Sequence, residues 1–571
     1  MLRKVGILIV NGGKDPKEGR WLEICVDKIK QQTEWPNYHL YVWNNNVHDF
    51  RINQILKSFP NQTLVQAPAE TLSHPHAVPL QRLYEIARQD GCHYIVTMDS
   101  DAHPICKGWL MEMIGALDEK TVISAVWRDE LNKGIRPYAH PSCFCTSVDF
   151  IEKHHLRLDF IAPRSEKVKH DTMTIFTDKA LELGLHIHKL RRSNRNEVHR
   201  LIGGIYGDMV YHHGAGTRII IGFHDDEEYR TQLLLEENRK IRDLATSLIF
   251  RHYDKYISWL KGWAADAAST SSARFFLIVG MHRSGTRCLA GSLERCGLYL
   301  GDVNRANDFN ANGNLTPSEI TRLHDEIFAA NGGNWLNPPK RICVSPKQEQ
   351  AMNDIVTKLT RRSPSGFKDP RSLLIMDTWL KVIGLNEVQI IGTFRNPVSV
   401  ARLLAKRNNM FEKDVYRLWL RYNNELVKLH KHYQFPLIEF DLSDVSIYYK
   451  TIASLAINLN LYPLLAELRH YIANSVNNYI NVEYNIPEIC QSTYKYLQEN
   501  SYKSDSSNDT FPALILELLQ IRDRQSKMHE YQVVNDTISN KGLKSLRYYL
   551  CSGLQALKCL PSKAKFWRLK A

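Results

Sequence analysis

The sequence lacks any apolar run long enough to cross a membrane. Its longest runs, such as Val5–Val10 and Phe275–Val279, have the length of a strand, whereas a bilayer span needs about 20 apolar residues. The first four residues lead straight into such a strand, without the apolar stretch of a secretory signal. We therefore expect a cytoplasmic protein.

Paired cysteines are also missing. The chain has 11 cysteines but no Cys-x-x-Cys pair, and the nearest two, Cys143 and Cys145, have no second pair to complete a zinc site. An odd number of scattered cysteines is typical of reduced, mostly buried thiols in a reducing compartment.

Acidic residues are absent from residues 541–571, which contain eight Lys and Arg. The formal net charge of the whole chain is +13, so this tail supplies most of the excess. Such a distribution argues against a nucleic-acid partner and suits domains that bind anionic nucleotide donors. Two interpretations of the tail stay open: a peripheral helix on anionic lipid at the inner face of a membrane, or a helix packed on the body of the protein.

Composition divides the chain into four segments. Residues 1–224 alternate apolar strands with helical stretches, which predicts a first α/β domain. Residues 225–273 lack proline and predict one or two connecting helices followed by an Ala- and Ser-rich linker. Residues 274–500 open a second α/β domain that becomes helical, and residues 501–571 hold a polar loop, a helical segment and the basic tail. We expect two α/β domains joined by helices, because 571 residues are too many for one core.

The strongest local motif is a strand, a glycine loop and a helix at Phe275–Gly297. Such a loop surrounds an anion with backbone N–H groups and a helix N-terminus. The spacing Gly280-x4-Gly285 is that of a nucleotide triphosphatase P-loop, but the Lys and Ser/Thr that follow there are replaced by Thr286 and Arg287. The missing groups would contact a γ-phosphate and Mg²⁺. This departure favours a donor without a γ-phosphate and leaves a sugar kinase as the weaker alternative.

Two further segments suit the same sheet. A predicted strand ends at Arg395, Pro397 fits the first helical position, and Ser399 lies in the first turn, where a second phosphate can bind. Between the motifs, Lys368 and Arg371 lie at another predicted strand end. Two separated anion sites on one parallel sheet suit a nucleotide phosphorylated at both its 5′ and 3′ positions.

On these motifs, residues 274–441 resemble the PAPS-dependent sulfotransferases of the carbohydrate and bacterial type. RSGT at 283–286 matches their 5′-phosphosulfate loop, Arg395 with Ser399 their 3′-phosphate motif, and KDPR at 368–371 a further segment near the active site. The resemblance implies in-line attack of a hydroxyl on the sulfur of PAPS, release of PAP, and stabilisation of the departing phosphate by Arg283 and Lys368 without a metal. The donor contacts it implies are His282, Arg283, Ser284, Gly285, Thr286, Arg287, Arg395 and Ser399.

The general base of this reaction is less well marked. Relatives often carry a Glu just after an Asn-x-x-Gly turn. Here the turn at 310–313 is followed by Asn314, Leu315 and Thr316, so no Glu stands at that position. Among Glu319, His324 and Asp325 on the next predicted helix, we favour Glu319. An ordinary solvated helix face is the alternative for each of the three.

In the first half, carboxylates follow a predicted buried strand. Asp99-Ser100-Asp101 ends this strand, and two carboxylates at this spacing can converge on a hard cation that also bridges a diphosphate. An earlier strand ends in the polar cluster Asn44–Asn46, where a nucleotide can lie in an open α/β sheet. The later segment Val210–Arg218 supplies two histidines.

With these features, residues 1–224 resemble family 2-like glycosyltransferases of the GT-A fold. The resemblance implies Mn²⁺ or Mg²⁺ held by Asp99 and Asp101 with His212 or His213, a nucleotide sugar contacted by Asn44, Asn46 and Asp99, and Asp171 as the base. Buried packing is the alternative for the two histidines, and an N-cap role is the alternative for Asp171.

The two resemblances together predict a bifunctional enzyme. Its first domain transfers a sugar to a glycan and its second sulfates a hydroxyl of that glycan, because a carbohydrate is the natural acceptor shared by both. The alternative is a sulfotransferase whose N-terminal domain is a non-catalytic sugar-binding module.

Overall fold

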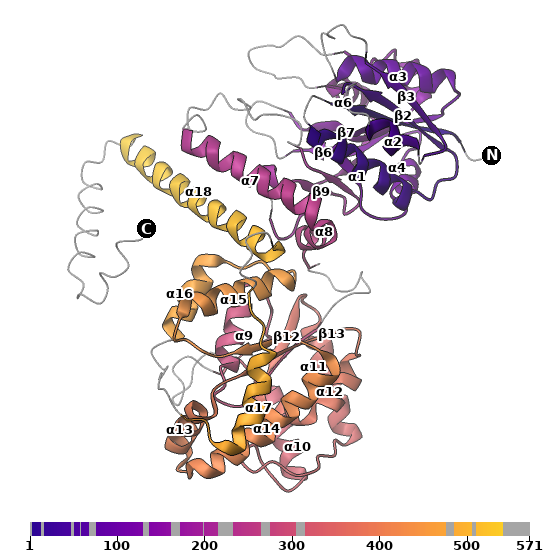
Figure 1. Ribbon diagram of the computed structural model, residues 1–571. Coiled ribbons are helices and arrows are strands. Elements are labelled where there is room, and N and C mark those ends of the chain that lie inside the picture. The colour runs from indigo at the N-terminus through magenta and orange to yellow at the C-terminus, as the bar shows by residue number, and fades with distance from the viewer. Residues whose placement is uncertain are drawn as a thin grey trace. The chain divides into compact units, whose positions relative to one another are not determined.

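The computed structural model describes most of the chain, and the structural statements below concern only those residues. They are residues 3–12, 16–46, 51–57, 59–67, 76–129, 136–160, 172–197, 199–214, 232–263, 275–303, 314–475, 485–504 and 510–540. The candidate base Asp171, the linker at 264–273, the turn at 310–313 and the basic tail therefore lie outside the described residues. Residues Met1–Ile515 form one compact unit and Leu516–Ala571 a second. The predicted α/β class is confirmed (Figure 1).

The first sheet has seven strands in the order β3-β2-β1-β4-β7-β6-β8. Strands β1 to β4 are parallel, whereas β7 runs antiparallel to both β4 and β6. The strands are β1 (Val5–Asn11), β2 (Tyr38–Asn44), β3 (Gln62–Gln66), β4 (Tyr94–Asp99), β6 (Thr121–Arg128), β7 (Tyr138–Ser147) and β8 (His186–Leu190).

Both faces of this sheet are covered by helices, which explains why its central strands are continuous apolar runs. Along β1, Val5, Ile7 and Ile9 pack into one core, and Leu8 and Val10 pack into the other. The first core includes α1 (Pro16–Gln32), α2 (Arg51–Lys57) and α4 (Trp109–Gly115). The second includes α3 (Ala77–Gln89), α5 (Val148–Lys153) and α6 (Thr174–Glu182).

A small antiparallel sheet extends from the end of β4. It consists of β5 (Ala102–Pro104), β10 (Val210–His212) and β9 (Gly204–Tyr206), the last preceded by the short helix η1 (Arg200–Ile202). Ala102 pairs with His212, so this sheet brings a histidine beside the carboxylates that follow β4. Two helices, α7 (Gln232–Arg251) and α8 (Tyr253–Lys261), then occupy the segment for which connecting helices are predicted.

The second large sheet has four parallel strands in the order β12-β11-β13-β14. Phe275, Leu277 and Val279 of β11 pack into a core formed with α10, α11, α12 and α14. The strands are β11 (Phe275–Val279), β12 (Ser365–Lys368), β13 (Val388–Phe394) and β14 (Leu437–Glu439). The helices among them are α9 (Thr286–Glu294), α10 (Ser318–Ala330), α11 (Pro346–Leu359), η4 (Pro370–Ile375), α12 (Met376–Ile383), α13 (Pro397–Asn408) and α14 (Glu412–Tyr433).

Helices alone follow β14 in the described residues. They are α15 (Val445–Asn458), α16 (Leu465–Ser475), α17 (Glu488–Glu499) and α18 (Phe511–Asn540). In the described part of the chain, no helix combines the length and the apolar character that a membrane crossing requires.

Each large sheet contains a topological switch point. In the first, the chain continues from β1 toward β2 and β3 on one side, and β4 lies on the other side of β1. In the second, β11 is followed by β12 on one side, whereas β13 is followed by β14 on the other. Ligands of open α/β sheets bind at such points, beside the carboxyl ends of the strands. The residues that follow β1, β4, β11 and β13 are therefore the places to look for sites.

Candidate functional site

An asparagine network closes the carboxyl ends of β1 and β2. Asn44 Oδ1 accepts from Asn11 Nδ2 and from the backbone N–H of Asn46, both at 3.0 Å. Its Nδ2 donates to the carbonyl of Asn46 and to Gln66 Oε1, also at 3.0 Å. The side-chain amide of Asn44 thus accepts two hydrogen bonds and donates two, and these bonds fix the turn that contains Asn46. Asn11 is fully buried, and its Oδ1 has no hydrogen-bond partner among the described residues.

The predicted metal motif lies beside this network, because Val10 of β1 pairs with Asp99 of β4. His212 Nε2 lies 3.5 Å from Asp99 Oδ2 and 3.6 Å from Asp101 Oδ1. His212 is therefore close enough to each of the two carboxylates to share a divalent cation with it.

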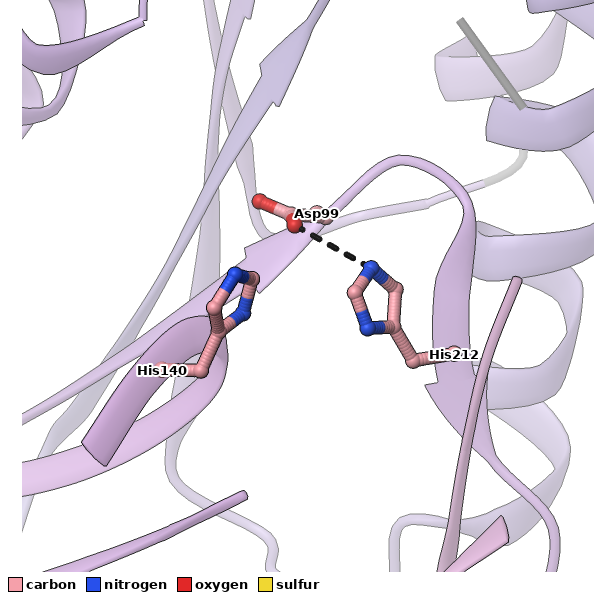
Figure 2. A group of neighbouring side chains, drawn as sticks. All are labelled: Asp99, His140 and His212. Carbon is pink, nitrogen blue, oxygen red and sulfur yellow. Dashed lines mark ion pairs between the residues drawn. The ribbon is translucent and has the colours of Figure 1, made fainter. Parts of the chain in front are cut away.

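A second histidine joins the group from β7. Asp99, His140 and His212 each offer one ligand atom, and these atoms all lie within 4.8 Å of one another. Figure 2 shows both rings directed at the carboxylate of Asp99, from opposite sides. A third imidazole, that of His76, lies 3.1 Å from Asp99 Oδ1 through its Nε2. His76 and His140 were not predicted from the sequence.

The charge balance of this group follows from burial and from its imidazoles. Burial alone would raise the pKa of Asp99, but the hydrogen bond and charge of His76, with the charges of His212 and His140, hold that pKa below its ordinary value. Burial, together with His140, lowers the pKa of His212 well below its ordinary value. The site thus presents an ionised carboxylate next to a neutral imidazole, which is the state in which both can ligate a cation.

His213, the alternative ligand, does not join this group. Because side chains alternate along β10, His213 faces away from His212. Its Nδ1 lies 2.8 Å from the hydroxyl of Tyr211, its Nε2 lies 3.2 Å from Thr246 Oγ1, and its ring packs on Trp21 with centroids 4.4 Å apart. Both ring nitrogens have partners, so the packing interpretation of His213 is the one that the structure favours.

The second candidate site begins at the glycine loop after β11. Arg283 and Gly285 adopt left-handed conformations with φ of +66° and +84°, and Gly285 is the N-cap of α9, where it offers no side-chain cap. A Cβ at Gly285 would collide with the ring of Phe440, and one at Gly280 with the carbonyl of Thr393. Ser284 is fully buried, and its Oγ has no hydrogen-bond partner among the described residues. The loop therefore leaves N–H groups and a hydroxyl available for an anion.

The loop after β13 lies directly beside the first. Val279 pairs with Gly392, and Thr393 Oγ1 donates a hydrogen bond of 2.9 Å to the carbonyl of Ser284. Arg395 is buried, with its guanidinium over the ring of Phe440 at 5.2 Å, and Phe440 is the residue that also contacts Gly285. The two predicted anion loops thus lie side by side at the switch point.

One detail of the second loop differs from the expectation. The predicted phosphate site includes the free N–H groups in the first turn of α13, but Asn396 Oδ1 caps those of Val398 and Ser399 at 2.9 and 3.3 Å. Contacts to an anion must therefore come from side chains, those of Arg395 and Ser399. An Asn directly before a Pro at the first helical position is a sequence signal for an N-cap, and Asn396 with Pro397 carries it.

Lys368 is a buried cation at the end of β12, beside β11. Its Nζ donates to the carbonyl of Asn314 at 2.5 Å and to Thr316 Oγ1 at 3.0 Å. Burial lowers its pKa to about 8. Asp369 acts to raise this pKa, whereas Arg371 and Arg287 lower it. Burial, Arg407 and Arg287 likewise lower the pKa of Arg283. These positive charges repel one another, and a bound anion relieves that repulsion. The site therefore favours an anion.

The three candidate bases are placed very differently. Glu319 Oε1 pairs with Lys358 Nζ at 3.1 Å on the surface, so the structure directs it toward α11. His324 is fully buried, accepts from Trp379 Nε1 at 3.0 Å and lies 3.2 Å from Asp369 Oδ1. Asp325 is half-exposed and pairs with Arg371. The ion pair of Glu319 fits the solvated-face alternative better than a catalytic role.

Comparisons with known proteins give only distant likenesses. No family model matches the sequence, and no curated protein is similar to it at a significant level. Among solved structures, the mannosyltransferase PcManGT from Pyrobaculum calidifontis in complex with GDP-Man and Mn²⁺ is 11% identical over 43% of this chain, with a TM-score of 0.26. This chain spans 63% of that protein's length.

Two further solved structures are similar to parts of the chain. S. aureus TarS residues 1–349 is 10% identical over 45% of this chain and 83% of its own, with a TM-score of 0.26. The bifunctional glycosyltransferase WbbM is 13% identical over 27% of this chain and 33% of its own, with a TM-score of 0.20. At these TM-scores the likenesses carry no argument about function, which has to come from the sites themselves.

Proposed function

We propose that the N-terminal half transfers a sugar from a nucleotide-sugar donor to a glycan. The observation that carries this proposal is the proximity of His212 to both Asp99 and Asp101 at the switch point, beside the asparagine turn at Asn44–Asn46. These donor atoms fit Mn²⁺ or Mg²⁺, which would supply the positive charge that stabilises a departing nucleoside diphosphate. Asp99, Asp101 and His212 would hold the cation, and the buried Oδ1 of Asn11 would accept from the nucleotide. Asp171 stays the proposed base.

We propose that the C-terminal half transfers a sulfuryl group from PAPS to a carbohydrate hydroxyl. Support comes from the two neighbouring loops, which are joined by the hydrogen bond between Thr393 and Ser284. The first loop suits the 5′-phosphosulfate, and Arg395 with Ser399 suits the 3′-phosphate. As the S–O bond to the donor phosphate breaks, Arg283 and Lys368 balance the charge that develops on that phosphate.

A glycan is the acceptor that both halves would share. The alternative, a non-catalytic N-terminal module that binds sugar, makes a different prediction: sulfuryl transfer without any metal-dependent transfer from a nucleotide sugar. We therefore propose an assay of the full chain with a panel of nucleotide sugars with and without Mn²⁺, and separately with radiolabelled PAPS and oligosaccharide acceptors. Label in oligosaccharide from both donors supports the bifunctional enzyme, and label from PAPS alone supports the alternative. Label from neither donor refutes both.

The glycine loop makes a prediction with an internal control. Gly285→Ala forces a Cβ into the ring of Phe440 at a left-handed position, where an L-residue costs about 1–2 kcal/mol before any clash. Gly297 has a similar φ of +97° but open space around its Cβ. We expect Gly285→Ala to weaken PAP binding at least about tenfold by calorimetry and Gly297→Ala to leave it unchanged. Equal affinities for the two variants would place the nucleotide elsewhere.

Lys368 makes binding of PAP depend on pH. Its pKa of about 8 in the empty site means that at pH 8.5 roughly a quarter of the molecules carry this charge. A bound anion raises the pKa, so binding takes up as much as about three quarters of a proton, and affinity falls as pH rises through about 8. Calorimetry at pH 8.5 in two buffers of different ionisation enthalpy measures this uptake, and Lys368→Met should abolish it. Binding without proton uptake would separate Lys368 from the nucleotide.

A further inference from the structure

The imidazole of His282, in the loop after β11, is oriented by two aromatic rings. It stacks on the ring of Trp335, with centroids 4.2 Å apart and planes 30° apart, and it meets the ring of Tyr422 edge-on at 6.0 Å. The hydroxyl of Tyr422 donates a hydrogen bond of 3.1 Å to the backbone carbonyl of Trp335, which joins the two partners. Aromatic contacts of this geometry restrict the rotation of a ring, so packing sets the direction of the imidazole.

No hydrogen bond connects this imidazole to the described residues. His282 Nδ1 is buried and has no partner among them, although buried polar atoms nearly always have one. Nε2 is not enclosed in this way, and the residue is partly exposed, so Nε2 is the nitrogen that a substrate can reach. An oriented ring whose nitrogens serve no bond within the protein is a candidate for a contact with substrate.

The surroundings of the ring keep it in the form that accepts a proton. Burial lowers the pKa of His282 to about 3. Asp369 raises this pKa, whereas the positive charges of Arg371, Lys368 and Arg407 lower it further. The ring is therefore neutral at physiological pH. An anionic donor bound near these cations would offset their effect and raise the pKa, which favours the uptake of a proton during the reaction.

The residues predicted as bases from the sequence are engaged elsewhere. Glu319 and Asp325 each form an ion pair with a basic side chain, and His324 is fully buried. In contrast, His282 directly precedes Arg283 in the loop proposed for the 5′-phosphosulfate, and its Nε2 is accessible. A base has to lie within reach of the attacking hydroxyl, which comes next to the sulfuryl group that this loop would hold.

We infer that His282 is the general base of the proposed sulfuryl transfer, on which this inference rests. As the oxygen of the acceptor hydroxyl forms its bond to sulfur, the proton of that hydroxyl passes to Nε2 of His282. The S–O bond to the donor phosphate breaks, and its electron pair stays on the phosphate of the departing PAP. Arg283 balances the charge that develops there.

His282→Ala removes the base and leaves the donor loops intact. A general base contributes about 100- to 10,000-fold, so we expect kcat to fall by this factor in the assay with radiolabelled PAPS and oligosaccharide acceptors. The affinity for PAP, measured by calorimetry on the full chain, should stay within about threefold. Imidazole added to this variant should raise its rate at least about tenfold, and more at higher pH, because only neutral imidazole accepts a proton.

His432→Ala is the matched control, because His432 is exposed in the last turn of α14. Its rate should equal that of the wild type and should not respond to imidazole. His282→Asn is a second variant that leaves less empty space beside Trp335, and we expect it to lose as much activity as His282→Ala.

Two results would overturn the inference while the proposed function stands. One is a wild-type kcat in a folded His282 variant. The other is a loss of PAP affinity that matches the loss of kcat, without a response to imidazole, since that would make His282 a donor contact. A wild-type chain that transfers no label from PAPS would instead refute sulfuryl transfer itself, and the role of His282 with it.

Discussion

Asp99→Asn is expected to remove Mn²⁺-dependent sugar transfer while the fold survives. Asp99 is the acidic residue that faces His212, His140 and His76, and an amide offers a cation neither the charge nor the ligand strength of the carboxylate. A catalytic cation is worth several kcal/mol, so turnover should fall more than about 100-fold. Turnover and Mn²⁺ affinity should be measured on the same preparation.

The matched control for this variant is Asp178→Asn on α6. Asp178 is exposed on the described surface, and the same change there should leave turnover and Mn²⁺ affinity unchanged. Asp99→Asn also removes the partner of His76, so the Tm of both variants should be compared. An Asp99→Asn protein that folds normally and keeps its Mn²⁺-dependent turnover would place the cation elsewhere.

Lys368→Met is expected to have the largest effect on the second half. The side chains are similar in length, but the variant lacks a charge whose electrostatic neighbours include His282 in the loop after β11 and Arg287 in α9. Losing one group that stabilises developing negative charge costs about 100- to 1,000-fold in kcat. We expect a fall of this size in sulfuryl transfer and a smaller change in the affinity for PAP, because the charge matters most as the phosphate departs.

Lys347→Met on α11 is the control for Lys368→Met. Lys347 is exposed, so the same chemical change there should leave kcat unaltered. The buried Lys368 also donates to Asn314 and Thr316, so a lower Tm is expected for its variant. A Lys368→Met protein that stays folded at the assay temperature and keeps its wild-type kcat would exclude this lysine from the reaction.

Sequence motifs predicted the parts of both sites that are formed by residues adjacent in the chain. The run Phe275–Val279 followed by Gly280 and Gly285 is a strand, loop and helix because the apolar residues and the glycines leave few alternatives. Asp99 ends a buried strand for the same reason. In both cases sequence neighbours decide the structure.

Residues whose place depends on distant pairing could not be found in this way. His140 lies near Asp99 because β7 pairs with β4. No sequence pattern around residue 140 predicts the register of that pairing. The choice between His212 and His213 follows from the pairing of β10 with β5, which sets the face that each residue occupies. Glu319 pairs with Lys358 because α10 packs against α11. The prediction of a helix at Glu319 does not reveal that packing.

The most direct test of the account is whether the two loops grip opposite ends of one nucleotide. Calorimetry should compare PAP with 5′-AMP, 3′-AMP and ATP with Mg²⁺ on the full chain. Each phosphate loop contributes charge-assisted hydrogen bonds worth about 1.5–3 kcal/mol each, so PAP should bind at least about 100-fold more tightly than either monophosphate and more tightly than ATP. Equal binding of PAP and 5′-AMP, or tighter binding of ATP with Mg²⁺, would contradict the proposed sulfuryl-transfer site.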